Sequence, residues 1–199
     1  MGEIGILAYG SLIDNPGSEI QPLIKERIKN LQTPFRVEFA RKSESRGDAP
    51  TLIPVEEGGA QINAQILILK HRVSEQEAMN LLWRRETRQE NSNKRYNPSA
   101  RSNTNRVTII KIENFKGIEK VFYTSIGQNI ENLTPDELSR LAIKSVRKTD
   151  NGEDGISYLI NAKNNGILTP LMPQYESEIL KKTSTKNLES ALLKIKRKS

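Results

Sequence analysis

The residues best suited to chemistry near the N-terminus are the four of the run Tyr9-Gly10-Ser11-Leu12. They directly follow an apolar stretch, residues 4–8, that is typical of a buried strand. Glycine and serine after a strand indicate a tight turn, and glycine permits backbone angles that expose successive N–H groups. Because exposed N–H groups bind anions, this loop predicts a pocket for a carboxylate or a phosphate.

Glu86 is the second candidate because of its place on a helix expected over residues 74–89. Ser74, followed three residues later by a glutamate, is typical of a capping box at the start of a helix. At about 100° per residue, Glu86 falls on the same side of the helix as Met79 and Leu82. We therefore expect the Glu86 carboxyl group to point toward the core.

A carboxylate is costly to bury unless it is paired or protonated, and burial raises the pKa of a carboxyl group toward the range useful for proton transfer. Glu86 is thus a candidate general acid–base. Two other interpretations stay open, namely an ion pair with Arg85 or an arginine of the following loop, and simple exposure at the helix end. Glu77, Asn80, Arg84 and Arg88 occupy the opposite side of the helix. The loop over residues 9–12 could likewise be an ordinary turn.

The positive charge of the chain is concentrated at its C-terminal end. The net charge is +7, and residues 181–199 hold seven basic residues and one acidic residue, which is +6 of that total. A solvated basic helix or tail explains this excess more simply than a site for nucleic acid or anionic lipid. We therefore expect a domain over residues 1–180, a basic C-terminal helix or tail over 181–199, and no nucleic-acid partner.

The composition indicates a soluble protein, with 35% hydrophobic and 28% charged residues among 199. We expect no membrane span, no secretory signal and no myristoylation, because the apolar stretches are short and Ile6 stands where a myristoylation signal has Ser or Thr. The chain has no cysteine, which is compatible with a cytoplasmic location. The sequence does not decide between a monomer and a homodimer.

The order of expected elements favours the α+β class, because strands gather in the first two thirds of the chain and helices in the last third. A helix or an irregular segment is expected over residues 19–31. The expected strands cover residues 4–8, 35–40, 51–55, 60–69, 106–112 and 120–125. The expected helices cover residues 74–89, 134–148, 155–164 and 176–182.

Taken together, two motifs resemble the gamma-glutamyl cyclotransferase-like superfamily, which includes the ChaC-type enzymes. The run Ala8-Tyr9-Gly10-Ser11-Leu12 is similar to the signature loop of that family. A second run is similar to the segment in which the family's catalytic glutamate follows a helix, and it reads Leu82-Trp83-Arg84-Arg85-Glu86.

Further segments extend the resemblance over roughly residues 4–176. Two of them resemble family strands, and they read Pro50-Thr51-Leu52-Ile53-Pro54 and Val121-Phe122-Tyr123-Thr124. A looser pattern near the C-terminus comprises Tyr158, Gly166, Pro173 and Tyr175.

The resemblance implies a small mixed β-barrel of about six or seven strands with flanking helices. It also implies conversion of a γ-glutamyl amine, such as a γ-glutamyl amino acid or glutathione, to 5-oxoproline and the free amine. Backbone N–H groups of Tyr9, Gly10, Ser11 and Leu12 would hold the α-carboxylate of the substrate. Glu86 would be the general acid–base, and neither a metal nor another cofactor would be required.

The segment after Glu86 departs from the family pattern, which often has a tyrosine a few residues after the glutamate. Here the nearest one is Tyr96, after a polar insert, and we expect it to close the substrate pocket. The insert makes one rim basic through Arg84, Arg85, Arg88, Lys94, Arg95 and Arg101, which either favours acidic substrates or is solvated surface. An inactive relative that binds an acidic metabolite or peptide in the same pocket is the alternative function.

Overall fold

The structure, a computed structural model, describes residues 2–99, 103–149 and 152–197. The chain divides into two compact units that alternate along the sequence. Unit 1 comprises Met1–Thr33 and Asn63–Gly127, and unit 2 comprises Pro34–Ile62 and Gln128–Ser199. This division runs through the range 1–180 that was expected to form one domain, and it assigns the basic C-terminal segment to unit 2.

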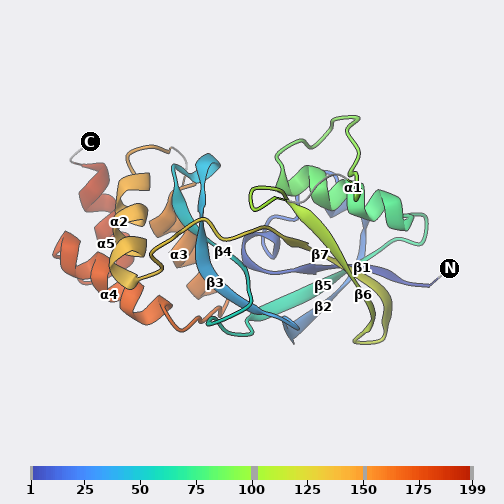
Figure 1. Ribbon diagram of the computed structural model, residues 1–199, viewed down its shortest axis with the longest axis horizontal. Helices are drawn as coiled ribbons and strands as arrows, with labels where there is room; N and C mark the ends of the chain where they lie inside the picture. Colours follow the sequence, from blue (N-terminus) through green and yellow to red (C-terminus); the bar gives the residue numbers. More distant parts are fainter. Residues whose placement is uncertain (1, 100–102, 150–151, 198–199) are drawn as a thin grey trace. The chain divides into compact units, whose positions relative to one another are not determined.

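Unit 1 is built on a five-stranded mixed sheet with the order β2-β5-β1-β7-β6 (Figure 1). Its central strand β1 pairs antiparallel with β5 and parallel with β7. The strands are β1 (Ile4–Ala8), β2 (Ile24–Gln32), β5 (Asn63–Leu69), β6 (Thr108–Phe115) and β7 (Ile118–Ser125). The apolar run of β1 is buried from Gly5 to Ala8, as its sequence predicted, and Ile6 and Ala8 belong to the hydrophobic core cluster of unit 1.

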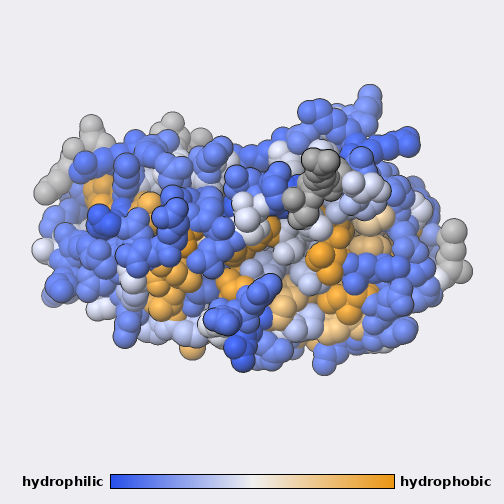
Figure 2. Space-filling model, viewed as in Figure 1, coloured by the Kyte–Doolittle hydropathy of each residue, from blue (hydrophilic) through white to orange (hydrophobic). Residues whose placement is uncertain are grey.

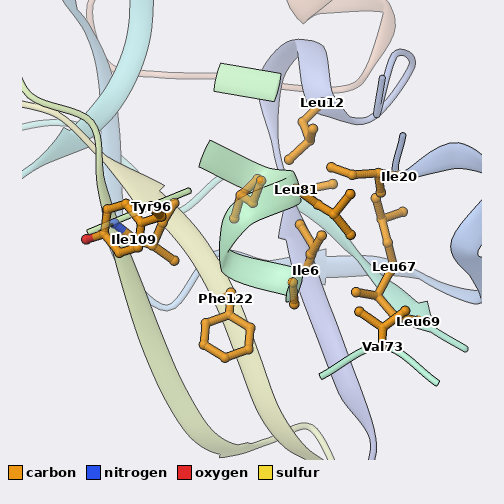
Figure 3. Packing of buried hydrophobic residues seen from close by; sticks show 13 residues of the cluster. Ile6, Leu12, Ile20, Leu67, Leu69, Val73, Leu81, Tyr96, Ile109 and Phe122 are labelled. Atoms are coloured by element: carbon orange, nitrogen blue, oxygen red, sulfur yellow. Dashed lines mark hydrogen bonds between the residues drawn. The ribbon is translucent and has the colours of Figure 1, made fainter. Parts of the chain in front are cut away.

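The helix α1 (Glu75–Glu86) contributes Leu81 and Leu82 to the hydrophobic core of unit 1. Ser74 caps its first turn by accepting a hydrogen bond from the Glu77 N–H at 3.2 Å, as the capping box predicted. Figure 3 shows Leu81 beside Ile6 of β1 and Leu12 of the following loop. The helix and the loop therefore pack against the same hydrophobic core.

Residues 24–32 form a strand, β2, where a helix or an irregular segment was expected. The partly buried side chains are Ile24, Arg27, Ile28 and Leu31, and their spacing is that of a helix. Pairing with β5 shows two register shifts, one between Ile24 and Glu26 and one between Ile28 and Leu31. At each irregularity the side chains switch between the two faces of the sheet. The regular alternation of apolar and polar residues, by which a strand is recognised in a sequence, is therefore lost.

Unit 2 contains the antiparallel pair β3 (Arg36–Ser43) and β4 (Ala49–Val55) and four helices. The helices are α2 (Pro135–Ser145), α3 (Gly155–Asn164), α4 (Met172–Thr183) and α5 (Leu188–Lys196). The buried Glu38 carboxylate of β3 accepts hydrogen bonds from Thr169 Oγ1 at 2.6 Å and from the Leu171 N–H at 3.1 Å. These contacts connect β3 to the segment in which α4 begins.

The basic C-terminal segment is helical and packed through an apolar side. Lys181 and Lys182 belong to α4, and α5 buries Leu188, Ala191 and Ile195. Of the two forms expected for residues 181–199, a helix or a tail, the described part is helical over residues 181–183 and 188–196.

The observed class is α+β, as expected, with short 3-10 turns at Gly10–Leu12, Gln21–Leu23 and Glu44–Arg46. Hydrogen bonding among the described residues gives a five-stranded and a two-stranded sheet, and no closed barrel is found there. The edges of the larger sheet are β2 and β6.

Hydrophilic residues cover most of the face shown in Figure 2. Within residues 2–99, 103–149 and 152–197, no helix has the length and apolar character needed to cross a membrane.

Candidate functional site

The loop after β1 is a tight turn, as its sequence predicted. Gly10 has φ +58°, in the left-handed region that favours glycine, and it begins a 3-10 turn that ends at Leu12. The Leu12 N–H donates to the Tyr9 carbonyl at 3.3 Å, and the Asn15 N–H donates to the Ser11 carbonyl at 3.0 Å. Of the four N–H groups expected to bind an anion, that of Leu12 thus has an acceptor inside the turn. Those of Gly10 and Ser11 begin the turn, where the geometry supplies no such acceptor.

Side chains hold this loop at both ends. The Tyr9 hydroxyl donates to the Thr124 carbonyl of β7 at 2.9 Å. The Leu12 side chain is buried in the core of unit 1. The loop is therefore fixed to the sheet on which it begins.

Glu86 is the last residue of α1, and its side chain is 24% exposed. Its Oε1 lies 2.5 Å from Arg85 Nη1, which confirms the ion pair that was one of the three interpretations of this residue. The carboxylate is neither fully buried nor freely solvated. It is held in a partly buried ion pair at the end of the helix.

Arg85 also reaches the loop after β1. Its Nη2 donates to the Asn15 carbonyl at 2.7 Å and to Ser11 Oγ at 3.3 Å. One guanidinium group therefore contacts both sequence-predicted parts of the site, the Ser11 loop and Glu86, and all of these residues belong to unit 1. Sequence reasoning identified Arg85 as a partner of Glu86, but not as a contact of the loop.

Asn80 and Arg84, on the polar side of the helix, are buried, which the polarity of that side did not indicate. The Arg84 guanidinium forms two bonds of 2.9 Å with the Glu19 carboxylate, and its Nη1 donates to the Lys94 carbonyl at 3.2 Å. Hydrogen bonding to Glu19 raises the pKa of Arg84 above its ordinary value. The polarity of this side did not predict its burial, because the polar side chains pair with polar partners that are distant in sequence.

The segment after α1 folds back along that helix. The Tyr96 N–H donates to Asn80 Oδ1 at 3.0 Å, and Glu90 Oε1 accepts from Ser18 Oγ at 3.1 Å. Lys94 and Arg95 are exposed on this segment, whereas Arg101 lies outside the described residues. The predicted basic rim is thus divided between two arginines in ion pairs, the buried Arg84 and the partly buried Arg85, and side chains that are exposed.

Tyr96, predicted to contact substrate, is 5% exposed and lies in the core cluster of unit 1 (Figure 3). Its hydroxyl oxygen accepts a hydrogen bond of 3.1 Å from the Ile109 N–H of β6. The contacts of this phenol are those of a packed core residue, and its role toward substrate stays a prediction.

A pocket of about 350 Å³ lies at the opposite end of α1 from Glu86. Its lining includes the exposed His71, together with Ser74, Glu75 and Lys120. The rise of 1.5 Å per residue separates the backbones of Glu75 and Glu86 by roughly 17 Å. This pocket is therefore distinct from the place where Glu86 and the Ser11 loop meet.

No protein-family model matches the chain, and no match was found among curated proteins.

Proposed function

We propose that the chain is a cyclotransferase that converts a γ-glutamyl amine or peptide to 5-oxoproline and the free amine. The observation that carries this proposal is the contact of Arg85 with both Glu86 and the Ser11 loop. It supports a common site for the two motifs that resemble the gamma-glutamyl cyclotransferase-like superfamily. The same proposal includes three further properties of the protein: the barrel fold of that family, a cytoplasmic location and a role in glutathione metabolism.

In the proposed reaction, the loop holds the substrate through its α-carboxylate. Glu86 accepts a proton from the α-ammonium group, and the freed nitrogen attacks the γ-carbonyl carbon of the same molecule. A bond forms between this nitrogen and the γ-carbon, the nitrogen releases a second proton to solvent and becomes the lactam N–H, and the bond between the γ-carbon and the departing amine breaks. Glu86 returns its proton to the departing amine and ends the cycle as a carboxylate.

This chemistry suits a site without a protein nucleophile, because the nucleophile is part of the substrate. The main requirement is to hold the glutamyl chain folded, with the nitrogen near the carbonyl carbon. A loop fixed by Tyr9 and Leu12 to the sheet supports that requirement. In this proposal Tyr96 closes the substrate pocket.

The proposal is tested by incubating the protein with a panel of γ-glutamyl amino acids and glutathione and detecting 5-oxoproline by mass spectrometry. We expect Glu86→Gln to lower turnover by about 10²- to 10⁴-fold, since it removes the general acid–base. Glu113→Gln is the matched control, because that side chain is 63% exposed on β6. Full turnover in Glu86→Gln would show that Glu86 is not the catalyst.

A second candidate is an inactive relative that binds an acidic metabolite or peptide in the same place. The Arg85–Glu86 ion pair favours it, because Arg85 occupies an oxygen of the carboxylate that would have to receive the substrate proton. This candidate predicts that γ-glutamyl compounds raise the melting temperature of both the wild type and Glu86→Gln, without release of 5-oxoproline from either.

A further inference from the structure

We propose that Arg85 binds the α-carboxylate of the ligand held by the loop of residues 9–12, and so sets the specificity of the site for acids over amides. This inference rests on the proposed function, because it concerns the same site. The family resemblance assigns carboxylate binding to backbone N–H groups alone. Arg85 adds a charged side chain to that binding site.

The Arg85 side chain is held at the loop. Its side chain is 14% exposed, and its stem lies against Gly17, where an added Cβ would come within 2.9 Å of Arg85 Cγ. Gly17 has φ +92°, a conformation that also disfavours a side chain. The loop thus leaves room for the arginine stem and aims the guanidinium at Ser11 and Asn15.

A carboxylate ligand at this site needs a positive charge nearby, because Glu86 is close. The loop binds anions only through the partial charges of N–H groups, whereas Glu86 places a full negative charge nearby. A ligand carboxylate beside Glu86 would be repelled unless a positive charge lay between the two. Arg85 lies there, with Nη1 toward Glu86 and Nη2 toward the loop.

The hydrogen bonds of Nη2 indicate how a ligand would enter. Its bond to Ser11 Oγ is long, at 3.3 Å, so exchanging it for a charge-assisted bond to a carboxylate is favourable. The planar guanidinium matches the two oxygens of a carboxylate, which a lysine ammonium does not. Nη1 can keep its bond to Glu86 while Nη2 changes partner.

The test compares γ-glutamyl-alanine with its analogue in which the α-carboxylate of the glutamyl group is a carboxamide. We expect the wild type to prefer the acid by about tenfold or more in KM, and Arg85→Gln to lose most of that preference. Arg85→Lys should keep part of it. Arg72→Gln removes the same charge from an exposed position before the first turn of α1, at the other end of the helix, and should leave the preference unchanged.

The ratio of the KM values for the two compounds distinguishes carboxylate binding by Arg85 from a structural role of Arg85. If Arg85 only supports the fold or orients Glu86, its replacement impairs both compounds equally, and the inference is overturned. Calorimetric binding of the same pair to Glu86→Gln gives a readout that needs no turnover. If no 5-oxoproline forms but the acid binds through Arg85, the proposed function fails and this inference stands. If the wild type binds neither compound, this inference fails.

Discussion

At the scale of single residues, Tyr96 can be tested as a core residue or as a substrate contact. Tyr96→Phe keeps the ring and removes the acceptor for the buried Ile109 N–H. We expect the free energy of unfolding to fall by about 1–2 kcal/mol, measured by urea denaturation, because that donor loses its partner. The KM for γ-glutamyl substrates should stay within about twofold, and a large rise in KM with unchanged stability would instead support substrate contact.

The candidate site shows what a sequence reveals about single side chains. The ion pair of Glu86 could be foreseen because Arg85 is its neighbour in sequence. The contact of Arg85 with Ser11 and Asn15 could not, since it depends on where the loop lies relative to the helix end. Local geometry therefore predicts the partner of the glutamate but not its connection to the loop.

At the scale of elements, the Arg84–Glu19 pair joins α1 to the segment that follows β1. Their side chains are 8% and 17% exposed, so Glu19→Gln leaves Arg84 with a buried charge and a weaker partner. We expect a loss of about 2–3 kcal/mol in the free energy of unfolding. This is below the cost of breaking a fully buried pair, because glutamine still accepts a hydrogen bond.

Two further variants test whether this loss of stability comes from the Arg84–Glu19 pair. Glu26→Gln, at an exposed position of β2, should change the free energy of unfolding by no more than about 0.5 kcal/mol. Combining Glu19→Gln with Arg84→Met should cost less than the sum of the single changes, as expected for residues in direct contact. Strict additivity would mean that the two side chains do not interact appreciably.

The elements also show where sequence patterns fail. α1 and its cap follow from local rules, because Ser74 and the apolar positions act within a few residues. β2 and the burial of Arg84 do not, since both depend on distant partners, namely β5 and Glu19. The alternation of the two units along the chain is likewise a long-range property that no local pattern displays.

At the scale of the whole molecule, the distribution of charge and the packing of α5 predict different roles for the C-terminal segment. The charge of +6 over residues 181–199 indicates a solvated or anion-binding segment, whereas three buried apolar side chains indicate a structural helix. Both features occur in one segment because they belong to different side chains: Leu188, Ala191 and Ile195 of α5 are buried, whereas Lys196 is exposed. Stability measurements can separate the two roles.

Ile195, 5% exposed, is the side chain through which the structural role can be tested. Ile195→Ala should lower the free energy of unfolding by about 2–4 kcal/mol, because it removes buried methyl groups and leaves a cavity. Lys196→Gln, at an exposed position of the same helix, removes one positive charge and should stay within about 0.5 kcal/mol of the wild type. Chemical denaturation of the three proteins measures both effects. Equal stability of Ile195→Ala and the wild type would contradict the packed helix and favour a solvated basic segment, whose binding to polyanions should then weaken steeply with salt.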